Sequence, residues 1–304
     1  MYRVLFPVDG SEASLRAARG LAAILRWSRA TAVEILNVQT EPFLAREDLP
    51  GSLRQRAERR VREEGERALA MADALLREVA ARTATTVRFG DAATAITLAA
   101  EMLDCSVIAM GSHGAGAIGS LLTGSVTTKV IHLGSRPVLV IPSAQLLTAS
   151  AQGPPHRAGR VLVPVDGSAG AAAAVEEVLR LASWFREAPE VHLLAAYEGT
   201  PLDVEIATML DASAVRDYQH TQFEAAFVPA RAVLSGTAFQ VIEHTAIGPP
   251  VEAIRAAVAA HRCDLVCMGT RGMGALRNLI LGSTTAKVLR AIDVPVLAVP
   301  PAGP

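Results

Sequence analysis

The sequence predicts an α/β protein made of two tandem domains, each with a parallel β-sheet covered by helices on both faces. Two observations lead to this prediction. Short, continuously apolar segments rich in Val, Ile and Leu alternate with longer segments of helical composition, and this alternation is typical of parallel strands buried on both sides. Four separated blocks of the first half of the chain also recur in the second half at a nearly constant offset, which indicates two copies of one domain.

The repeat is visible in four separated blocks. The segment RVLFPVDGS returns as RVLVPVDGS, with Asp9 matching Asp166 at an offset of 157 residues. MGSHG returns as MGTRG, TGSVTTKV as LGSTTAKV, and RPVLVIP as VPVLAVP, each at an offset of 158 residues. The stretch between the copies consists of small and polar residues with Pro and Gly among them, as is typical of linkers. The predicted boundaries are therefore 1–142 for the first domain, 143–158 for the linker and 159–304 for the second domain.

Each element of the first copy has a sequence signal of its own. The first apolar strand stops at Asp-Gly-Ser, and the Ala- and Leu-rich segment behind it has helical spacing. The second strand precedes a long Arg/Glu/Ala-rich run with a solvated charged face and a short strand that stops at Gly90. A helix, the buried strand SVIAMG, the glycine-rich loop, a helix closed by Gly134 and the strand PVLVIP follow. The expected ranges are Arg3–Val8, Ala32–Gln39, 85–90, 106–111 and 137–142 for strands, and Ala13–Trp27, 46–82, Ala92–Leu103 and Val126–Leu133 for helices.

The second copy repeats this order. Its long helix, at about 203–234, contains Pro229, which we expect to kink or end the helix because proline removes a backbone hydrogen bond. This segment is richer in apolar and aromatic residues than the charged run of the first copy. One face of the tandem is therefore a candidate surface for an unknown protein partner.

The bulk composition excludes several classes of protein. The 304 residues include 29 Lys plus Arg against 30 Asp plus Glu, so no basic excess points to nucleic-acid binding. No apolar run approaches the roughly 20 residues of a membrane-spanning helix, and the start of the chain lacks the order of a signal peptide. We therefore expect no nucleic-acid partner and no membrane association.

Cysteine usage points to a reducing compartment. Cys105, Cys263 and Cys267 are too few and too scattered for a disulfide framework. Cys263 and Cys267 flank an apolar strand, but no second pair of ligands accompanies them. We therefore expect buried thiols, no metal site and a cytoplasmic protein.

The loop GSHGAGAIGSLLTGS contains two overlapping glycine patterns. The narrow one is Gly114, Gly116 and Gly119 in the G-x-G-x-x-G spacing of dinucleotide-binding loops. That motif needs an acidic residue about 20 positions further on to hold a ribose, and none stands there. The second copy has Arg277 in place of the third glycine, and no G-K-[ST] of a Walker A loop occurs anywhere. We therefore treat the narrow pattern as a by-product of a glycine-rich loop.

The wide pattern, by contrast, is present in both copies. Glycines at a strand end and in a sharp turn let backbone N–H groups approach a ligand closely. A helix that starts at Gly-Ser then favours an anion such as phosphate. The alternative is that these glycines only build tight turns and that Ser125 is an N-cap. The members of the pattern are Gly111, Gly114, Gly124 and Ser125 in the first copy and Gly269, Gly272, Gly282 and Ser283 in the second.

Asp9 and Asp166 each end the first strand of their copy. In open α/β sheets, ligands bind beyond the carboxyl ends of the strands. A carboxylate there can accept hydrogen bonds from a ribose or a base, or lie near a phosphate-bound cation. The alternative is a structural role, as an Asx turn or as the N-cap of the following helix, and the two roles are compatible.

These motifs together resemble those of the universal stress protein family. P-V-D-G-S, M-G-[ST]-x-G, G-x-x-G-x9-G-[ST] and P-V-L-x-[VI]-P are present in both halves. The resemblance implies an adenine nucleotide alpha hydrolase-like, Rossmann-like sandwich, with a five-stranded parallel sheet of order 3-2-1-4-5 between two helical layers. Members of the family commonly pair through the last strand. The resemblance therefore implies an internal pseudo-dimer of the two halves and leaves a further homodimer open.

The resemblance also implies ATP, with Mg²⁺ as an optional companion, because members with the wide glycine motif bind it. In the first copy the implied residues are Pro7, Val8, Asp9 and Gly10 on the adenosine side, Val38 near the base, Met110, Gly111 and Gly114 in the turn, and Gly124, Ser125 and Val126 at the phosphates. In the second copy they are Val165, Asp166, Gly167, Ala196, Met268, Gly269, Gly272, Gly282, Ser283 and Thr284. His113 stands where arginine is frequent in the family, so the first site is the less basic one.

Three hypotheses for function follow. The first is a stress-response regulatory protein that binds ATP without efficient turnover and has no catalytic residue. Neither phosphate loop carries a Walker lysine or an adjacent carboxylate placed to activate water, as fast hydrolysis requires. The second is a slow ATPase or nucleotidyl-transferring enzyme with His113 as catalyst, although its counterpart is Arg271. The third is a nucleotide-independent adaptor or scaffold whose glycines serve only as turns.

Overall fold

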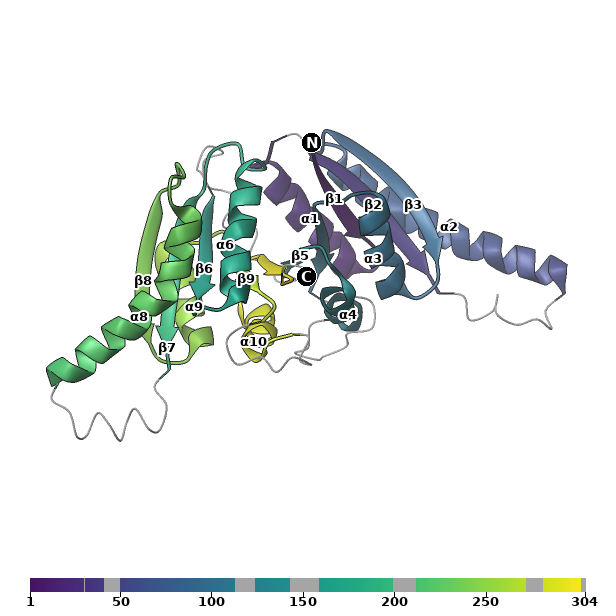
Figure 1. Ribbon diagram of the computed structural model, residues 1–304. Helices are drawn as coiled ribbons and strands as arrows, with labels where there is room; N and C mark the ends of the chain where they lie inside the picture. The colour runs from purple at the N-terminus through teal and green to yellow at the C-terminus, as the bar shows by residue number, and fades with distance from the viewer. Residues whose placement is uncertain are drawn as a thin grey trace. The chain divides into compact units, whose positions relative to one another are not determined.

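Two compact units, Met1–Pro155 and His156–Pro304, make up the chain (Figure 1). The computed structural model describes residues 1–29, 31–40, 50–112, 124–142, 159–198, 212–271 and 281–301. The predicted linker at 143–158 lies outside these residues. Among the described residues, no helix is both long enough and apolar enough to span a membrane.

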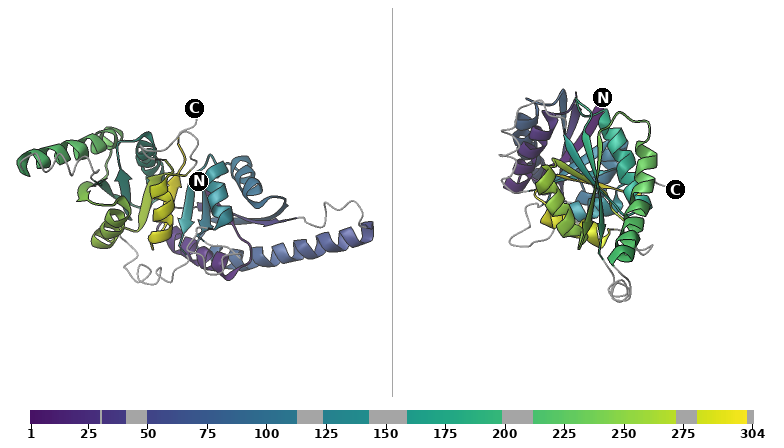
Figure 2. Two further views of the ribbon diagram at one scale, coloured as in Figure 1. Left: turned by 90° about the horizontal axis from the view of Figure 1, so that it is seen from below. Right: turned by 90° about the vertical axis from the view of Figure 1, so that its left-hand side faces the viewer.

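Parallel strands form the sheet of the first unit, and helices cover both of its faces (Figure 2). The described strands number five and lie in the order β3-β2-β1-β4-β5. Their bounds are β1 Tyr2–Pro7, β2 Thr31–Gln39, β3 Arg82–Phe89, β4 Val107–Gly111 and β5 Val138–Ile141. Helices α1 Glu12–Leu25 and α2 Gly51–Leu76 pack together on one face, and α3 Ala92–Met102 and α4 Ser125–Leu133 pack together on the other.

The second unit repeats this arrangement. Its described strands lie in the order β8-β7-β6-β9-β10, so the predicted order and the two helical layers are confirmed in both copies. The strands are β6 Arg160–Val165, β7 Glu190–Tyr197, β8 Val241–Ile247, β9 Leu265–Gly269 and β10 Val296–Val299. Helices α6 Ala169–Ala182 and α8 Ala212–Leu234 pack together on one face, and α9 Pro250–His261 and α10 Ser283–Ala291 on the other (Figure 2).

Burial explains why the apolar segments form central strands. Every residue of β9 is buried, and so is all of β4 except its last glycine. Strand β8, at the edge of its sheet, alternates between exposed and half-buried residues instead. The central strands are therefore covered by helices on both faces.

The long charged helix of the first unit is shorter than the sequence suggests. We expected it at 46–82, but α2 ends at Leu76. Beyond that end, the Ala81 N–H donates to the Thr31 carbonyl (2.9 Å) and joins the sheet instead of the helix. The Arg- and Ala-rich sequence contains no helix breaker here, so the end is set by a partner on another strand.

Pro229 does not end the corresponding helix of the second unit. Helix α8 continues to Leu234, so the expectation that the helix ends at this proline is wrong. Phe227, Ala230 and Leu234 are buried on both sides of the proline, where α8 packs against α6 and β7. This packing offsets the single hydrogen bond that proline removes.

Two glycines bring helix α6 into direct backbone contact with the end of β9. A Cβ atom on Gly170 would lie 1.8 Å from the carbonyl oxygen of Arg271. A Cβ atom on Gly269 would lie 2.4 Å from the carbonyl oxygen of Gly170. No side chain fits between these backbones, so the first turn of α6 lies directly against the segment that follows β9.

Gly170→Ala should therefore destabilise the second unit by about 1–3 kcal/mol, because the new methyl group overlaps the Arg271 carbonyl and forces the backbone to shift. Gly51→Ala, at the start of α2, is the matched control because nothing lies within 4 Å of that position. It should leave the first unit unchanged or stabilise it by up to about 1 kcal/mol. Urea unfolding followed by tryptophan fluorescence measures both, since Trp27 and Trp184 report on different units. An unchanged midpoint for Gly170→Ala would contradict the close contact.

Candidate functional site

A cavity of about 350 Å³ lies in the second unit, beyond the carboxyl ends of β6, β7 and β9. The first turn of α9 and the start of α10 complete its walls. Pockets for small molecules commonly measure about 300–1,000 Å³, so the cavity can hold part or all of such a ligand. The described lining residues are Pro164, Val165, Asp166, Ser168, Ala171, Leu194, Ala196, Pro250, Ile254, Met268, Gly269, Arg271, Gly282, Ser283, Thr284 and Thr285.

Most residues predicted for the second site line this cavity, and Gly167 and Gly272 are the exceptions. Gly167 has a φ of +79°, and a Cβ there would lie 3.3 Å from the Ala225 carbonyl oxygen of α8. Its glycine is therefore required by the turn and by the helix contact. Gly272 lies outside the described residues. The predicted residues that do line the cavity are Val165, Asp166, Ala196, Met268, Gly269, Gly282, Ser283 and Thr284.

One wall of the cavity lies outside the sequence motifs. Leu194 of β7 and Pro250 and Ile254 of α9 belong to it. Leu194 precedes Ala196 by two residues, so strand alternation puts both on one face of the sheet. Pro250 and Ile254 are one helical turn apart. Periodicity could have grouped these residues, but only the fold shows that α9 faces the loop motifs.

Asp9 and Asp166 each form an Asx turn. The Ser11 N–H donates to Asp9 Oδ1 and the Ser168 N–H to Asp166 Oδ1, both at 3.0 Å. The N-caps of the following helices are the serines, whose side chains accept from backbone N–H groups three residues on. The turn alternative is therefore correct, and the N-cap alternative is wrong. In the second unit, Asp166 also lines the cavity.

The same pair of hydrogen bonds ties the last helix to a strand end in both units. One bond runs from a glycine N–H at the helix start, and the other from a buried threonine hydroxyl one turn later. The wide glycine pattern therefore marks a fixed junction between strand and helix. The bonds are Gly124 N–H to Ser112 O (2.6 Å), Thr127 hydroxyl to Gly111 O (3.0 Å), Gly282 N–H to Thr270 O (2.7 Å) and Thr285 hydroxyl to Gly269 O (2.9 Å).

Glycine, and not serine, is the N-cap residue of α4 and α10. Gly124 and Gly282 make no side-chain cap hydrogen bond, so the alternative in which Ser125 is the N-cap is wrong. The first N–H groups of each helix are not capped by the residue in front of them. Together with the helix dipole, they favour an anion at this point. Ser125 and Ser283 are exposed at the first helical position, next to the same N–H groups.

Arg271 supplies a positive charge to the cavity. Its Nε atom is buried and has no hydrogen-bond partner among the residues that the structure describes. A buried donor without a partner costs about 1–3 kcal/mol, and an anionic ligand in the cavity would supply the missing acceptor. In the sequence, Arg271 stands out only as the counterpart of His113. His113, Gly114, Gly119 and Arg277 all lie outside the described residues.

The residues predicted for the first site lie at the corresponding strand ends and helix start. Gly114 is the exception, because it lies outside the described residues. The remaining residues are Pro7, Val8, Asp9 and Gly10 at the end of β1, Val38 in β2, Met110 and Gly111 in β4, and Gly124, Ser125 and Val126 at the start of α4.

A buried amide distinguishes the first unit from the second. Asn37, which is 1% exposed, donates to the Val8 carbonyl (2.8 Å) and accepts from the Gln39 amide (2.7 Å). The strand registers place Ala195 and Tyr197 at the equivalent positions of the second unit. Because side chains alternate along a strand, this pair lies on the face of β2 opposite Val38, next to Gly65 of α2, and it does not touch the predicted base contact.

The cysteines are buried thiols. Cys105, Cys263 and Cys267 are all free and buried. Burial raises the pKa of Cys263 to about 12 and that of Cys105 to about 11, and it also raises the pKa of Cys267. The Cys267 thiol donates to the Ala174 carbonyl (3.4 Å). The three thiols are therefore neutral groups that pack in the core.

The fold and the cavity together define a class of protein. Each unit is a doubly wound, Rossmann-like α/β domain, and the second unit places its cavity where such domains bind small molecules. The model of the universal stress protein family matches residues 1–142 and 158–300. The chain therefore belongs to the universal stress protein family, with one family domain in each half.

Known relatives agree with this assignment. Universal stress protein Rv2005c of Mycobacterium tuberculosis is 29% identical over 196 residues, which are 64% of this chain and 61% of that protein. The chain thus spans about three fifths of the length of this mycobacterial relative. Universal stress protein MJ0531 of Methanocaldococcus jannaschii is 32% identical over 141 residues, or 46% of this chain and 81% of that protein. The crystal structure of a universal stress protein from Archaeoglobus fulgidus shares the fold, with a TM-score of 0.69 and 23% identity over 99% of this chain and 98% of that one.

Removing the hydroxyl at the strand–helix junction should destabilise a unit. Thr127→Val deletes the hydrogen bond to the Gly111 carbonyl and should lower the free energy of unfolding of the first unit by about 1 kcal/mol. Thr128→Val, next to it on the same helix, is half-buried and should change the free energy by less than about 0.5 kcal/mol. Urea unfolding read at Trp27 compares the two variants, and equal midpoints would show that the junction bond contributes nothing.

Proposed function

We propose that the second unit binds ATP in its cavity and that the chain is a regulatory, stress-response protein without efficient turnover. The observation that supports this most directly is the division of the cavity into an apolar side and a cationic side. Leu194 and Ile254 lie on the side of β7 and α9, whereas Arg271 lies on the side of β9 and α10. A nucleotide has the same division, between its base and its phosphates.

The strand order indicates which end of the cavity would hold the base and which would hold the phosphates. Strand β6 lies between β7 and β9, so Asp166 at its end lies between the apolar and the cationic sides. The Ser168 N–H holds one carboxylate oxygen in place (3.0 Å), and the carboxylate would accept hydrogen bonds from the ribose. The adenine would then lie near β7, and the phosphates would lie at the start of α10 beside Arg271. Where Mg²⁺ accompanies ATP, Asp166 is the lining carboxylate that would face it.

We extend the proposal to the first unit, which has the same Asx turn at Asp9 and the same glycine N-cap at Gly124. On the face of β2 that corresponds to the cavity side of β7, Leu36 and Val38 stand where the second unit has Leu194 and Ala196, so both base sides are apolar.

The lining of the cavity also favours binding over hydrolysis. Among the described lining residues, Asp166 is the one carboxylate, and it is engaged in the turn. Fast phosphoryl transfer to water needs a group that positions the attacking water. We therefore infer that nucleotide occupancy changes the surface offered to a protein partner. The free, buried cysteines favour a reducing compartment such as the cytoplasm.

Arg271→Ala should weaken ATP binding by about tenfold or more, because a charge-assisted hydrogen bond contributes about 1.5–3 kcal/mol. Adenosine binding should not change, since adenosine lacks the phosphates. Arg290→Ala is the matched control, because Arg290 is exposed on α10 and is not among the cavity-lining residues. Isothermal titration of the full wild-type chain and of both variants with ATP and with adenosine gives the six affinities.

Two outcomes would count against the proposal. A folded wild-type chain that binds no adenine nucleotide at millimolar concentration removes the activity altogether. An equal loss of ATP and adenosine binding in Arg271→Ala would place the arginine away from the phosphates. Loss of a buried, unpaired donor should leave the variant at least as stable as the wild type, so unfolding is not the expected cause of weaker binding.

A further inference from the structure

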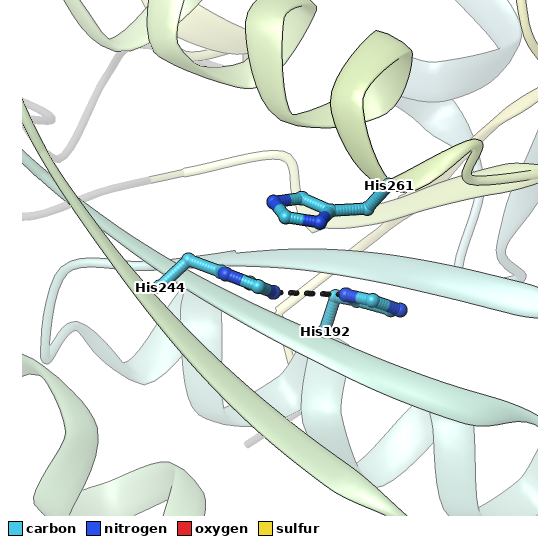
Figure 3. A group of neighbouring side chains, drawn as sticks. All are labelled: His192, His244 and His261. Atoms are coloured by element: carbon cyan, nitrogen blue, oxygen red, sulfur yellow. Dashed lines mark hydrogen bonds between the residues drawn. The ribbon is translucent and has the colours of Figure 1, made fainter.

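Three histidines meet in the second unit, away from the nucleotide cavity. His192 comes from β7, His244 from β8 and His261 from the last position of α9 (Figure 3). One ring nitrogen from each lies within 4.8 Å of the others. His192 Nδ1 and His244 Nε2 are 2.9 Å apart, and the rings of His244 and His261 stack with their centroids 3.9 Å apart. None of the three lines the cavity.

A carboxylate orients the most buried of the three rings. His192 is 3% exposed, and its Nε2 atom lies 2.7 Å from Glu190 Oε1. Because the carboxylate can only accept, Nε2 carries the proton, and the lone pair of Nδ1 points at the other histidines. Metal-binding histidines are commonly held in this way by a carboxylate behind them.

Arg160 holds this arrangement together. Its Nε atom lies 3.1 Å from Glu190 Oε1, and its Nη1 atom donates to the His261 carbonyl (2.9 Å). One guanidinium therefore compensates the charge of the orienting carboxylate and fixes the end of α9 that carries the third histidine. Burial, together with the neighbouring His261 and His192, lowers the pKa of His244 and so favours its neutral form.

The cluster is not required by the fold. In the first unit the equivalent positions are Glu34, Thr86 and Leu103, as the strand registers and the shared repeat offset show. The first unit forms the same sheet and the same α3 helix without any of these rings. The histidines are therefore a feature of the second unit alone and need an explanation of their own.

We propose that His192, His244 and His261 form a binding site for one zinc-class divalent transition metal ion per chain. Zinc–nitrogen bonds of about 2.0–2.1 Å in a tetrahedral site put the ligand nitrogens about 3.3 Å apart. The observed separations bracket this value, so small rotations of the rings complete the site. Neutral imidazoles select zinc, copper, nickel or cobalt over magnesium and calcium, which prefer oxygen.

The fourth coordination position falls to water. His244 and His261 are half-buried, so the cluster is accessible from outside and an ion can enter. Three protein nitrogens with one exchangeable position are the ligand set of an open zinc site, in contrast to the closed, four-ligand sites that serve only structure. The site therefore offers the ion a position that a small anion or a partner's side chain can occupy.

Metal binding to the full chain tests the proposal directly. Equilibrium dialysis of tag-free, nucleotide-free protein against Zn²⁺ should give one bound ion per chain, and not two as a repeat-derived site would. Co²⁺ in place of zinc should give the visible absorption of a tetrahedral centre. His261→Ala and His244→Gln should each weaken Zn²⁺ binding by about tenfold or more. His220→Ala is the matched control, because this histidine is exposed on α8, and it should bind zinc as the wild type does.

Either of two results overturns the proposal. A folded wild-type chain that binds no Zn²⁺ at micromolar concentration reduces the cluster to stacked, hydrogen-bonded rings. Unchanged binding in the His244→Gln/His261→Ala double variant means that the ion lies elsewhere. Circular dichroism checks the fold of each variant, and the wild-type titration decides the matter if every variant unfolds. Because no nucleotide is present, neither result bears on ATP binding.

Discussion

The junction between the last helix and a strand end determines where the rest of each unit can lie. In the second unit, the Gly282 N–H and the Thr285 hydroxyl bind the carbonyl groups at the end of β9. Gly170 then brings the first turn of α6 against the same segment, with no room for a side chain. The end of β9, the start of α10 and the first turn of α6 are thereby held next to one another. The N-terminus of α10 stays at the carboxyl ends of the central strands because moving it away would break these hydrogen bonds.

The elements of the fold could be predicted from the sequence because their signals are local. The apolar runs of β1, β4 and β5, and their repeats, each lie in a short window and need no partner to be recognised. The end of α2 was missed because the Ala81 N–H is taken by Thr31 on another strand. The passage of α8 through Pro229 was missed because burial of Phe227 and Leu234 offsets the loss at the proline. Both outcomes depend on residues far away along the chain.

The candidate site, like the fold, could be predicted only where its residues belong to local sequence motifs. Asp-Gly-Ser and Gly-[ST] are contiguous motifs, and they identified the walls of the cavity that β6, β9 and α10 form. The wall formed by α9, and the buried Nε of Arg271, follow only from the folded arrangement. The histidine cluster has no motif at all, since His192 and His244 are 52 residues apart. Only the pairing of β7 with β8 and the position where α9 ends bring its members together.

Joining two copies of the domain in one chain allows the copies to carry different side chains at equivalent positions. In a homodimer of single-domain subunits, symmetry repeats every side chain in both halves. Here Asn37 occupies a position that the other copy fills with Ala195, and Glu34 a position filled with His192. The two domains therefore share one fold but differ in side chains at equivalent positions, and every chain contains one of each. Because the two domains are covalently linked, each domain is always joined to the other kind and never to a copy of itself within one chain.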